Sequence, residues 1–212
     1  MDSRIERKYI EEVIACARRL DEKGMVNGFE GNISTRHNGL IYITPTGKNK
    51  ALLTEDMIAV VDEDGNQIGG NCKPTSELPM HRDAYAVRDD IAGVIHTHAP
   101  FLTAYALCNM PVETHAYPEM MGNFGRFEVA PYGRPGTDAI FEGAVPILKR
   151  RDVCLLGNHG AITVGKSLTD AMNKMEAAES IAKIMCITRV LGKPVDLSEE
   201  ECAFFFSLSN RE

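Results

Sequence analysis

The sequence IAGVIHTH, residues 91–98, is an apolar run that ends in two histidines separated by a single residue. A short apolar run of this kind is typical of a strand buried inside a sheet. Side chains two positions apart on a strand project from the same face, so His96 and His98 can both approach one metal ion. Because the following Ala99-Pro100 ends the strand, we expect this pair at the open end of the sheet, within reach of solvent.

A third histidine has a comparable setting further along the chain. His159 is part of LLGNHG, residues 155–160, between two apolar segments, and its small neighbours allow a tight turn. Three histidines with an open position are the arrangement of a catalytic rather than a structural zinc site. The residues alone also allow two hydrogen-bonded histidines beside a loop and an exposed turn histidine, and these alternatives stay open at this point.

Periodicity and turn residues predict the elements around these histidines. Helical spacing and capping signals predict helices over residues 4–23, 74–88, 100–107, 137–149, 168–191 and 198–207. Apolar runs beside turn residues predict strands over residues 31–36, 40–44, 57–61, 66–68, 91–98, 127–129, 153–156 and 160–164. This order predicts an α/β fold with one partly antiparallel sheet and helices on both of its faces. No linker-like stretch divides the sequence, so we expect one domain over residues 1–212.

Composition argues against several classes of function. The net charge is −7 and the densest basic run is Lys149-Arg150-Arg151, whereas nucleic-acid-binding proteins usually carry a basic patch. No window approaches the roughly 20 apolar residues of a membrane span. Residues 1–8 carry both signs of charge and no apolar signal core, so we expect a cytoplasmic protein. The six cysteines form no C-x-x-C pair and are predicted to be reduced packing residues.

Three small polar segments are candidates for binding an anion such as phosphate. Thr75-Ser76-Glu77 is predicted to open a helix with Ser76 as its N-cap, and helix N-termini present unpaired N–H groups to anions. Thr46-Gly47 and Gly31-Asn32 are two further small polar turns. Each of these segments, taken alone, is also ordinary turn chemistry.

Five short motifs together resemble those of a known family: GNIS at 31–34, ITPTG at 43–47, PTSE at 74–77, HTH at 96–98 and NHG at 158–160. Their order and spacing are similar to those of the class II aldolase/adducin family, and most of all to its L-fuculose-1-phosphate aldolases. The resemblance extends from the first predicted helix to LSEE at 197–200. It implies a three-layer α-β-α sandwich with a central, largely antiparallel sheet, and a homotetramer with active sites at subunit interfaces.

The resemblance also implies a role for each motif position. His96, His98 and His159 match the ligands of one Zn²⁺ per subunit. Glu77 matches the glutamate that ligates zinc in the resting enzyme and acts as general base, and Tyr117 lies near a tyrosine that donates a proton from a neighbouring subunit. The positions that match the phosphate-binding residues are Gly31, Asn32, Thr46, Gly47, Thr75 and Ser76.

The implied reaction is the cleavage of a ketose 1-phosphate to dihydroxyacetone phosphate and an aldehyde. The implied substrate is L-fuculose 1-phosphate or a related deoxy-sugar phosphate. Pentulose-phosphate 4-epimerases and methylthioribulose-1-phosphate dehydratases or aldolases resemble the same pattern, and the epimerases carry aspartate where this chain has Glu77. Adducin-like interaction modules are the non-enzymatic alternative, against which the intact set of three histidines argues.

Three further features bear on substrate and mechanism. The C-terminal segment Phe204-Phe205-Phe206-Ser207 contains no tyrosine where the fuculose enzymes use a second one, which leaves the aldehyde partner open. The lysines that border the motifs are Lys48 and Lys73, and the implied chemistry needs no lysine Schiff base. His81 follows Glu77 by one helical turn and is a candidate partner for its carboxylate.

Overall fold

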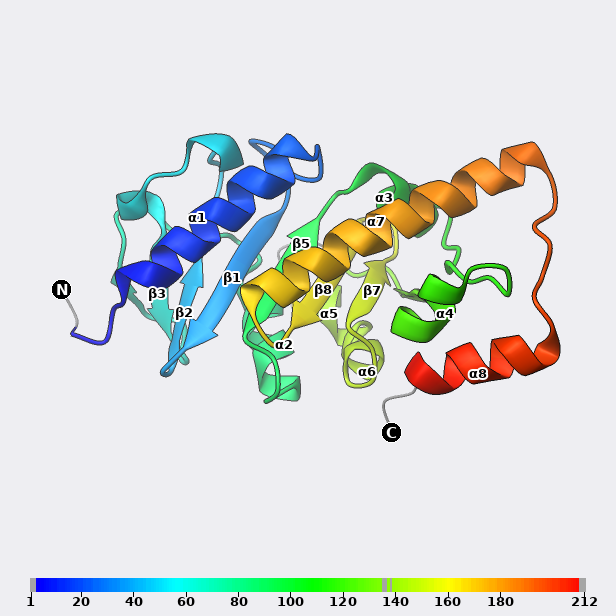
Figure 1. Cartoon of the computed structure of the whole chain (residues 1–212). Helices are drawn as coiled ribbons and strands as arrows, with labels where there is room; N and C mark the ends of the chain where they lie inside the picture. Colours follow the sequence, from blue (N-terminus) through cyan, green and yellow to red (C-terminus); the bar gives the residue numbers. More distant parts are fainter. Residues whose placement is uncertain (1–2, 135–136, 138, 210–212) are drawn as a thin grey trace.

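The computed structural model describes residues 3–134, 137 and 139–209, and its centre is an eight-stranded sheet (Figure 1). The strands lie in the order β4-β3-β2-β1-β5-β8-β7-β6, and only the pair β6–β7 is parallel within this part of the chain. The strand bounds are β1 Asn32–His37, β2 Leu40–Ile43, β3 Ala59–Asp62, β4 Gln67–Gly69, β5 Gly93–Thr97, β6 Glu128–Ala130, β7 Val153–Leu156 and β8 Gly160–Gly165. The predicted α/β class and largely antiparallel sheet are confirmed.

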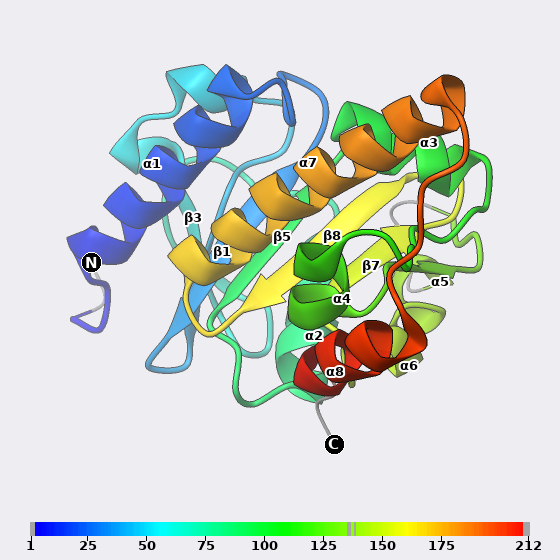
Figure 2. The ribbon, with the colours of Figure 1, turned by 45° about the vertical axis from the view of Figure 1, so that its right-hand side comes forward.

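Both faces of the sheet are buried, because successive side chains alternate between two hydrophobic clusters. In β7, Val153 and Leu155 belong to one cluster, whereas Cys154 and Leu156 belong to the other. Figures 1 and 2 show α1 and α7 crossing the same face of the sheet. The first cluster includes residues of α1 (Arg7–Glu22), α3 (Pro100–Leu107) and α7 (Leu168–Leu191), and the second includes residues of α2 (Leu78–Val87), α5 (Ala139–Glu142) and α6 (Val145–Leu148).

The long helix α7 shows how the sequence specifies one of these elements. Its N-cap is Ser167, whose hydroxyl accepts a hydrogen bond from the backbone N–H of Asp170 at 3.1 Å. Buried residues along the helix recur at three- and four-residue spacing, as at Ala171, Met175 and Ala178. Each large apolar side chain buried in this way contributes about 1.5–3 kcal/mol. The predicted helix over 168–191 is confirmed.

Two helices lie beside one another at the opposite end of the sheet from α1. The helix α4 (Pro118–Phe124) packs against α8 (Glu199–Ser209), which follows the segment after α7 (Figure 2). Sequence reasoning did not predict α4, because seven residues that include a proline and a glycine carry little helical signal. Tertiary packing stabilises it through Met120 and Met121, which are completely buried.

Most other predicted elements are confirmed with small shifts at their ends, but one differs. The predicted helix over 137–149 consists of two short helices, α5 and α6, separated by Gly143-Ala144. At Gly143 a Cβ would lie only 2.9 Å from Cδ of Pro131, so this close approach requires glycine. Thr137, where that helix is predicted to begin, is not helical, and Asp138 lies outside the described residues. No helix described in this structure is long and apolar enough to span a bilayer.

Candidate active site

Strand pairing brings the motif residues from distant parts of the sequence to one end of the sheet. In the β1–β5 ladder Asn32 lies directly opposite His96, and in the β5–β8 ladder Thr97 lies opposite Ala161. The turn between β7 and β8 therefore places His159 next to the end of β5. Asn158 in this turn has φ of 56°, in the left-handed region that asparagine adopts more readily than most residues. The position predicted for the histidine pair, at the end of a buried strand, is confirmed.

The three histidines form one compact group. One ring nitrogen from each of His96, His98 and His159 lies within 4.8 Å of the others. The Nε2 atoms of His96 and His98 are 3.1 Å apart, and the rings of His96 and His159 are stacked with centroids 4.7 Å apart. Because all three rings converge, the alternative of a separate exposed turn histidine is wrong, whereas the 3.1 Å contact between His96 and His98 is also that of a hydrogen-bonded pair.

The hydrogen bonds of the rings leave the facing nitrogens available. Nδ1 of His96 lies 2.9 Å from the carbonyl oxygen of Ala161, to which it donates, so Nε2 carries the lone pair. Nδ1 of His98 lies 3.6 Å from Oε1 of Glu30, on the side away from the group. Metal-ligating histidines commonly have such a carbonyl or carboxylate partner on the second nitrogen.

Burial favours the neutral forms of the His96 and His98 rings. It lowers the pKa of His96 to about 3, although the neighbouring Glu77 carboxylate acts in the opposite direction. Burial also lowers the pKa of His98, with a further contribution from the charge of His159. A neutral imidazole is the form that binds a metal ion, so protons do not compete for these nitrogens near neutral pH.

The donor set fits a divalent transition metal. Nε2 of His159 is buried and makes no hydrogen bond to any described residue, although it is 3.2 Å from Oε1 of Glu77. Three imidazole nitrogens with a nearby carboxylate are the ligands of a catalytic zinc site, whereas Mg²⁺ and Ca²⁺ prefer oxygen ligands. The group of His96, His98 and His159 can therefore hold a metal ion.

The two carboxylate oxygens of Glu77 lie beside His159 and His96. Oε2 lies 3.6 Å from Nε2 of His96 and accepts a hydrogen bond from Nδ2 of Asn32 at 2.6 Å. Burial disfavours the ionised carboxylate, but His159, His96 and the Asn32 amide outweigh burial and hold the pKa of Glu77 well below its usual range. Glu77 is thus an anion that can act as a metal ligand or accept a proton.

The segment around Glu77 differs from the prediction in one detail. The helix α2 begins at Leu78 with Glu77 at the N-cap position, so the predicted N-cap at Ser76 is wrong. The N–H of Leu78 donates to the carbonyl of Thr75 at 3.1 Å, and this turn sets Glu77 one residue before the helix. The predicted proline in the first turn, Pro79, is confirmed.

The segments predicted to bind phosphate lie next to one another. The N–H of Thr46 donates to the carbonyl of Lys73 at 3.2 Å, and the N–H of Thr75 donates to the carbonyl of Thr44 at 3.1 Å. Gly47 has φ of 62°, and no atom lies within 4 Å of the position its Cβ would take. These bonds use the backbone N–H groups of Thr46 and Thr75, so the donors left for an anion in the paired segments are the N–H of Gly47 and the hydroxyls of Thr46, Thr75 and Ser76.

Gly31 and Asn32 lie between this rim and the histidines. Gly31 has φ of 79°, and a Cβ there would lie 2.5 Å from Cγ1 of Val26 and 3.1 Å from the carbonyl oxygen of His96. Only glycine fits at this position. One N–H of the Asn32 side chain is used by Glu77, as described above, and Oδ1 of the same amide lies 2.5 Å from Nε2 of His81.

Tyr117 is separate from the site within a single chain. It occupies the N-cap position of α4 and packs against the hydrophobic cluster that α7 covers. Among the described residues, no hydrogen bond or ion pair joins it to Glu77 or to the three histidines. Its role as a proton donor from a neighbouring subunit stays a prediction.

Lys50 was missed by sequence reasoning, which considered only Lys48 and Lys73. It lies on the short helix η1 (Lys50–Leu52), is only 3% exposed, and has no hydrogen-bond partner among the described residues. Burial lowers the pKa of its ammonium group, and the charges of Asp21, Glu30 and Glu77 oppose that effect. No sequence motif marks a buried lysine, so only the tertiary structure could find it.

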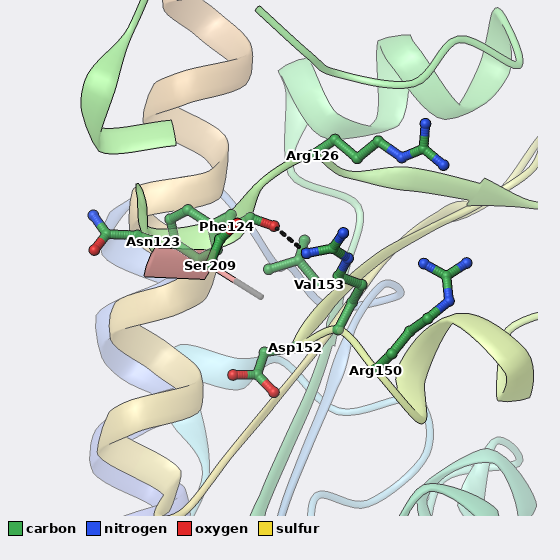
Figure 3. Close-up of a pocket in the computed structure, with 8 residues that line it drawn as sticks. Asn123, Phe124, Arg126, Arg150, Asp152, Val153 and Ser209 are labelled. Carbon is green, nitrogen blue, oxygen red and sulfur yellow. Dashed lines mark hydrogen bonds between the residues drawn. The ribbon is translucent and has the colours of Figure 1, made fainter. Parts of the chain in front are cut away.

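A second charged cluster lies in a different pocket (Figure 3). Outside the set of lining residues, Glu128 forms ion pairs with Arg126, Arg150 and Arg151. Nη1 of Arg151 donates to the carbonyl of Phe124 at 3.3 Å, the hydrogen bond drawn in Figure 3. None of the residues that line this pocket belongs to the histidine site, and Glu128 offsets part of the positive charge. We therefore assign it no part in the chemistry of the site.

Comparison with known proteins agrees with this geometry. The profile described as "Class II Aldolase and Adducin N-terminal domain" matches residues 11–186. An L-fuculose phosphate aldolase of Methanococcus maripaludis is 35% identical over 82% of this chain and 94% of its own length. A 5-methylthioribulose-1-phosphate/5-deoxyribulose-1-phosphate aldolase of Rhodospirillum rubrum is 33% identical over 81% of this chain and 77% of its own length.

A solved structure extends the similarity to the fold. It is of an L-fuculose 1-phosphate aldolase and superimposes with a TM-score of 0.88, at 31% identity over 96% of each chain. The matched region includes all five motifs and both partners of the Asn32–His96 strand pair. The chain therefore belongs to the family of class II aldolases and adducin N-terminal domains.

Proposed function

We propose that this protein is a zinc-dependent aldolase that cleaves a ketose 1-phosphate to dihydroxyacetone phosphate and an aldehyde. The observation that carries the proposal is the position of Glu77, an anionic carboxylate with its oxygens 3.2 Å from His159 and 3.6 Å from His96. A metal site with a base beside it suits the removal of a proton next to a carbonyl group.

We propose that His96, His98 and His159 hold one Zn²⁺ per subunit. Zinc in this position would act as a Lewis acid on the carbonyl and adjacent hydroxyl oxygens of the substrate. The facing Nε2 atoms are the donor atoms, and the carbonyl of Ala161 holds the His96 ring in the required orientation. Glu77 is an additional ligand of the resting site and leaves it to act as a base.

The remaining steps are proposed for residues of the chain. The phosphate is bound by Gly31, Asn32, Thr46, Gly47, Thr75 and Ser76, whose backbone and hydroxyl donors compensate for the lack of a basic patch. In the condensation direction Glu77 accepts the proton from C3 of dihydroxyacetone phosphate. Tyr117 of a neighbouring subunit donates a proton to the aldehyde oxygen as the new bond forms. The active assembly is a homotetramer in the cytoplasm, with sites between subunits.

The aldehyde partner is the least constrained part of the proposal. L-fuculose 1-phosphate is the first candidate, since two of the similar proteins carry the name of that activity. The second candidate is a 5-deoxy- or 5-methylthio-pentulose 1-phosphate. It is favoured by the apolar segment Phe204-Phe205-Phe206 in α8, where the fuculose enzymes use a tyrosine, and by the activity named for the Rhodospirillum rubrum relative.

The test is release of dihydroxyacetone phosphate from L-fuculose 1-phosphate, 5-deoxyribulose 1-phosphate and 5-methylthioribulose 1-phosphate, with and without a chelator. We expect the wild type to release dihydroxyacetone phosphate from one of these substrates. The chelator should abolish this release and added zinc should restore it. The Glu77→Gln variant should release none. Epimerisation of a pentulose 5-phosphate, or loss of water from the methylthio substrate without release, would replace this proposal with the epimerase or the dehydratase. If no substrate is converted, either with or without added zinc, the result would favour an interaction module.

A further inference from the structure

A chain of buried hydrogen bonds leads from Glu77 into the protein between β1 and α2. The Asn32 amide joins Oε2 of Glu77 to Nε2 of His81, with lengths of 2.6 and 2.5 Å. Nδ1 of His81 lies 2.7 Å from Oγ of Ser34, which lies 2.8 Å from the hydroxyl of Tyr85. His81 and Ser34 are completely buried and Asn32 and Tyr85 nearly so. Water therefore does not compete for these bonds.

The direction of each bond follows from the donors and acceptors available. The Glu77 carboxylate can only accept, so the Asn32 amide presents its nitrogen to Glu77 and its oxygen to His81. Because an amide oxygen can only accept, His81 carries its proton on Nε2, and Nδ1 is left as an acceptor. The hydroxyl of Ser34 donates to Nδ1, and the hydroxyl of Tyr85 donates to Ser34.

This chain makes the two oxygens of Glu77 unequal. Oε2 already accepts the hydrogen bond of Asn32, whereas Oε1 is the oxygen 3.2 Å from Nε2 of His159. A proton placed on Oε2 would neutralise the oxygen that accepts from Asn32 and weaken that hydrogen bond, whereas a proton on Oε1 leaves Oε2 as the carbonyl-type acceptor. A 180° flip of the Asn32 amide would let Oδ1 accept from a proton on Oε2. His81 opposes this flip, because its Nε2–H would then face the amide nitrogen, which is a donor, instead of the oxygen.

We propose that His81 is a positioning residue which, through the Asn32 amide, directs the proton taken from the substrate to Oε1 of Glu77. The inference rests on the proposed aldolase function, since Glu77 must act there as a base. His81 is not among the residues proposed to hold the substrate or the metal, so it acts only by positioning Glu77. Ser34 and Tyr85 serve the same purpose by keeping Nδ1 of His81 an acceptor.

A merely structural His81 would satisfy buried polar groups without affecting proton transfer, and two matched variants separate these roles. The amide nitrogen of glutamine reaches the place of Nε2, so His81→Gln keeps the donor to Asn32. The shorter side chain of His81→Asn reaches only the place of Nδ1 and keeps the contact with Ser34 alone. Both variants are neutral amides in the same cavity.

The experiment measures exchange of the C3 proton of dihydroxyacetone phosphate with deuterated solvent, a step that needs no aldehyde. For His81→Asn we expect a maximal exchange rate lower on the order of 10- to 100-fold, as for a misplaced general base. The concentration of dihydroxyacetone phosphate at half-saturation and the zinc content should stay close to those of the wild type, and the melting temperature should fall by a similar amount in both variants, because each loses one of the two buried contacts of His81. His81→Gln should retain an exchange rate within about threefold of the wild type, a change of less than 1 kcal/mol.

A second readout is independent of activity. The ¹⁵N chemical shifts of the His81 ring in the zinc-loaded protein should identify the neutral form with its proton on Nε2. Protonation on Nδ1, or equal exchange rates in the two variants, would overturn the role of His81 while leaving the aldolase intact. A wild type that binds zinc but exchanges no proton would overturn the proposed function, and with it this inference.

Discussion

Glu179 accepts a hydrogen bond from the backbone N–H of Leu102 at 2.9 Å, and its second carboxylate oxygen accepts one from the N–H of Phe101 at the same distance. These N–H groups belong to the first turn of α3, which begins at Pro100 directly after the histidine pair. A residue in the middle of α7 therefore caps the helix that follows the candidate metal ligands.

Replacement of Glu179 by alanine should lower the free energy of unfolding by about 2 kcal/mol, because two buried N–H groups lose their acceptors. Glu179→Gln should cost less, since its amide keeps one oxygen. Urea unfolding of both variants measures the difference. The control is Glu176→Ala, which removes partly exposed ion pairs with Arg19 and Lys23 and should cost less than about 1 kcal/mol. Equal stability of all three variants would contradict the capping role.

Removal of a histidine from the group should abolish metal binding. We expect one zinc per chain in the wild type and little in His159→Ala or His96→Ala, because two imidazoles and a carboxylate hold zinc more weakly than three imidazoles and a carboxylate. The control is His115→Ala, whose ring contacts Phe206 rather than the site. Elemental analysis after dialysis gives the result, and a His115 variant that also lost zinc would argue against the assigned ligands.

The two glycines of the candidate phosphate site should respond differently to alanine. At Gly31 the new Cβ meets Val26 and the His96 carbonyl, so Gly31→Ala should lower both the melting temperature and the zinc content. At Gly47 the space is open, so Gly47→Ala should cost only about 1 kcal/mol for its positive φ. If phosphate binds there, the added methyl group should raise KM with little change in the melting temperature.

Lys50 should favour the binding of an anionic substrate, because its buried ammonium group has no hydrogen-bond partner among the described residues. Lys50→Met keeps the apolar stem and removes the charge. We expect its KM for the sugar phosphate to rise about tenfold with kcat nearly unchanged, which corresponds to about 1.4 kcal/mol. Lys48→Met, at an exposed position two residues away, is the matched control. An unchanged KM in Lys50→Met would exclude this contribution.

Stability should fall on acidification partly because of His81. Burial lowers its pKa from 6.5 to about 4, so the unfolded chain binds a proton between these values and the folded chain does not. The stabilisation is present above pH 6.5 and is lost as the pH falls from about 6.5 towards 4. Over that range His81 should contribute a slope of up to about 1.4 kcal/mol per pH unit. His81→Gln, measured by urea unfolding in the presence of chelator, should show a correspondingly shallower dependence.

The sequence by itself determined the elements that have strong local patterns. Residues 168–191 carry helical periodicity, and residues 91–98 form a short apolar run typical of a buried strand, so both are predicted. The three histidines could be named from their settings beside apolar strands, and Glu77 from the resemblance of the PTSE motif at 74–77 to that of the family. Short elements such as α4 escaped prediction, because packing of Met120 and Met121 rather than local propensity stabilises them.

Only the tertiary structure decided which distant residues meet. The antiparallel pairing of β1 with β5 sets Asn32 opposite His96, and the packing of α2 on that face brings His81 against Asn32. Neither contact follows from local sequence, because strand register depends on the whole sheet. Burial of Lys50 and the approach of Glu179 to α3 are likewise products of packing between segments far apart in the chain. The residues of the candidate site were therefore readable from the sequence, whereas the hydrogen bonds that orient them were not.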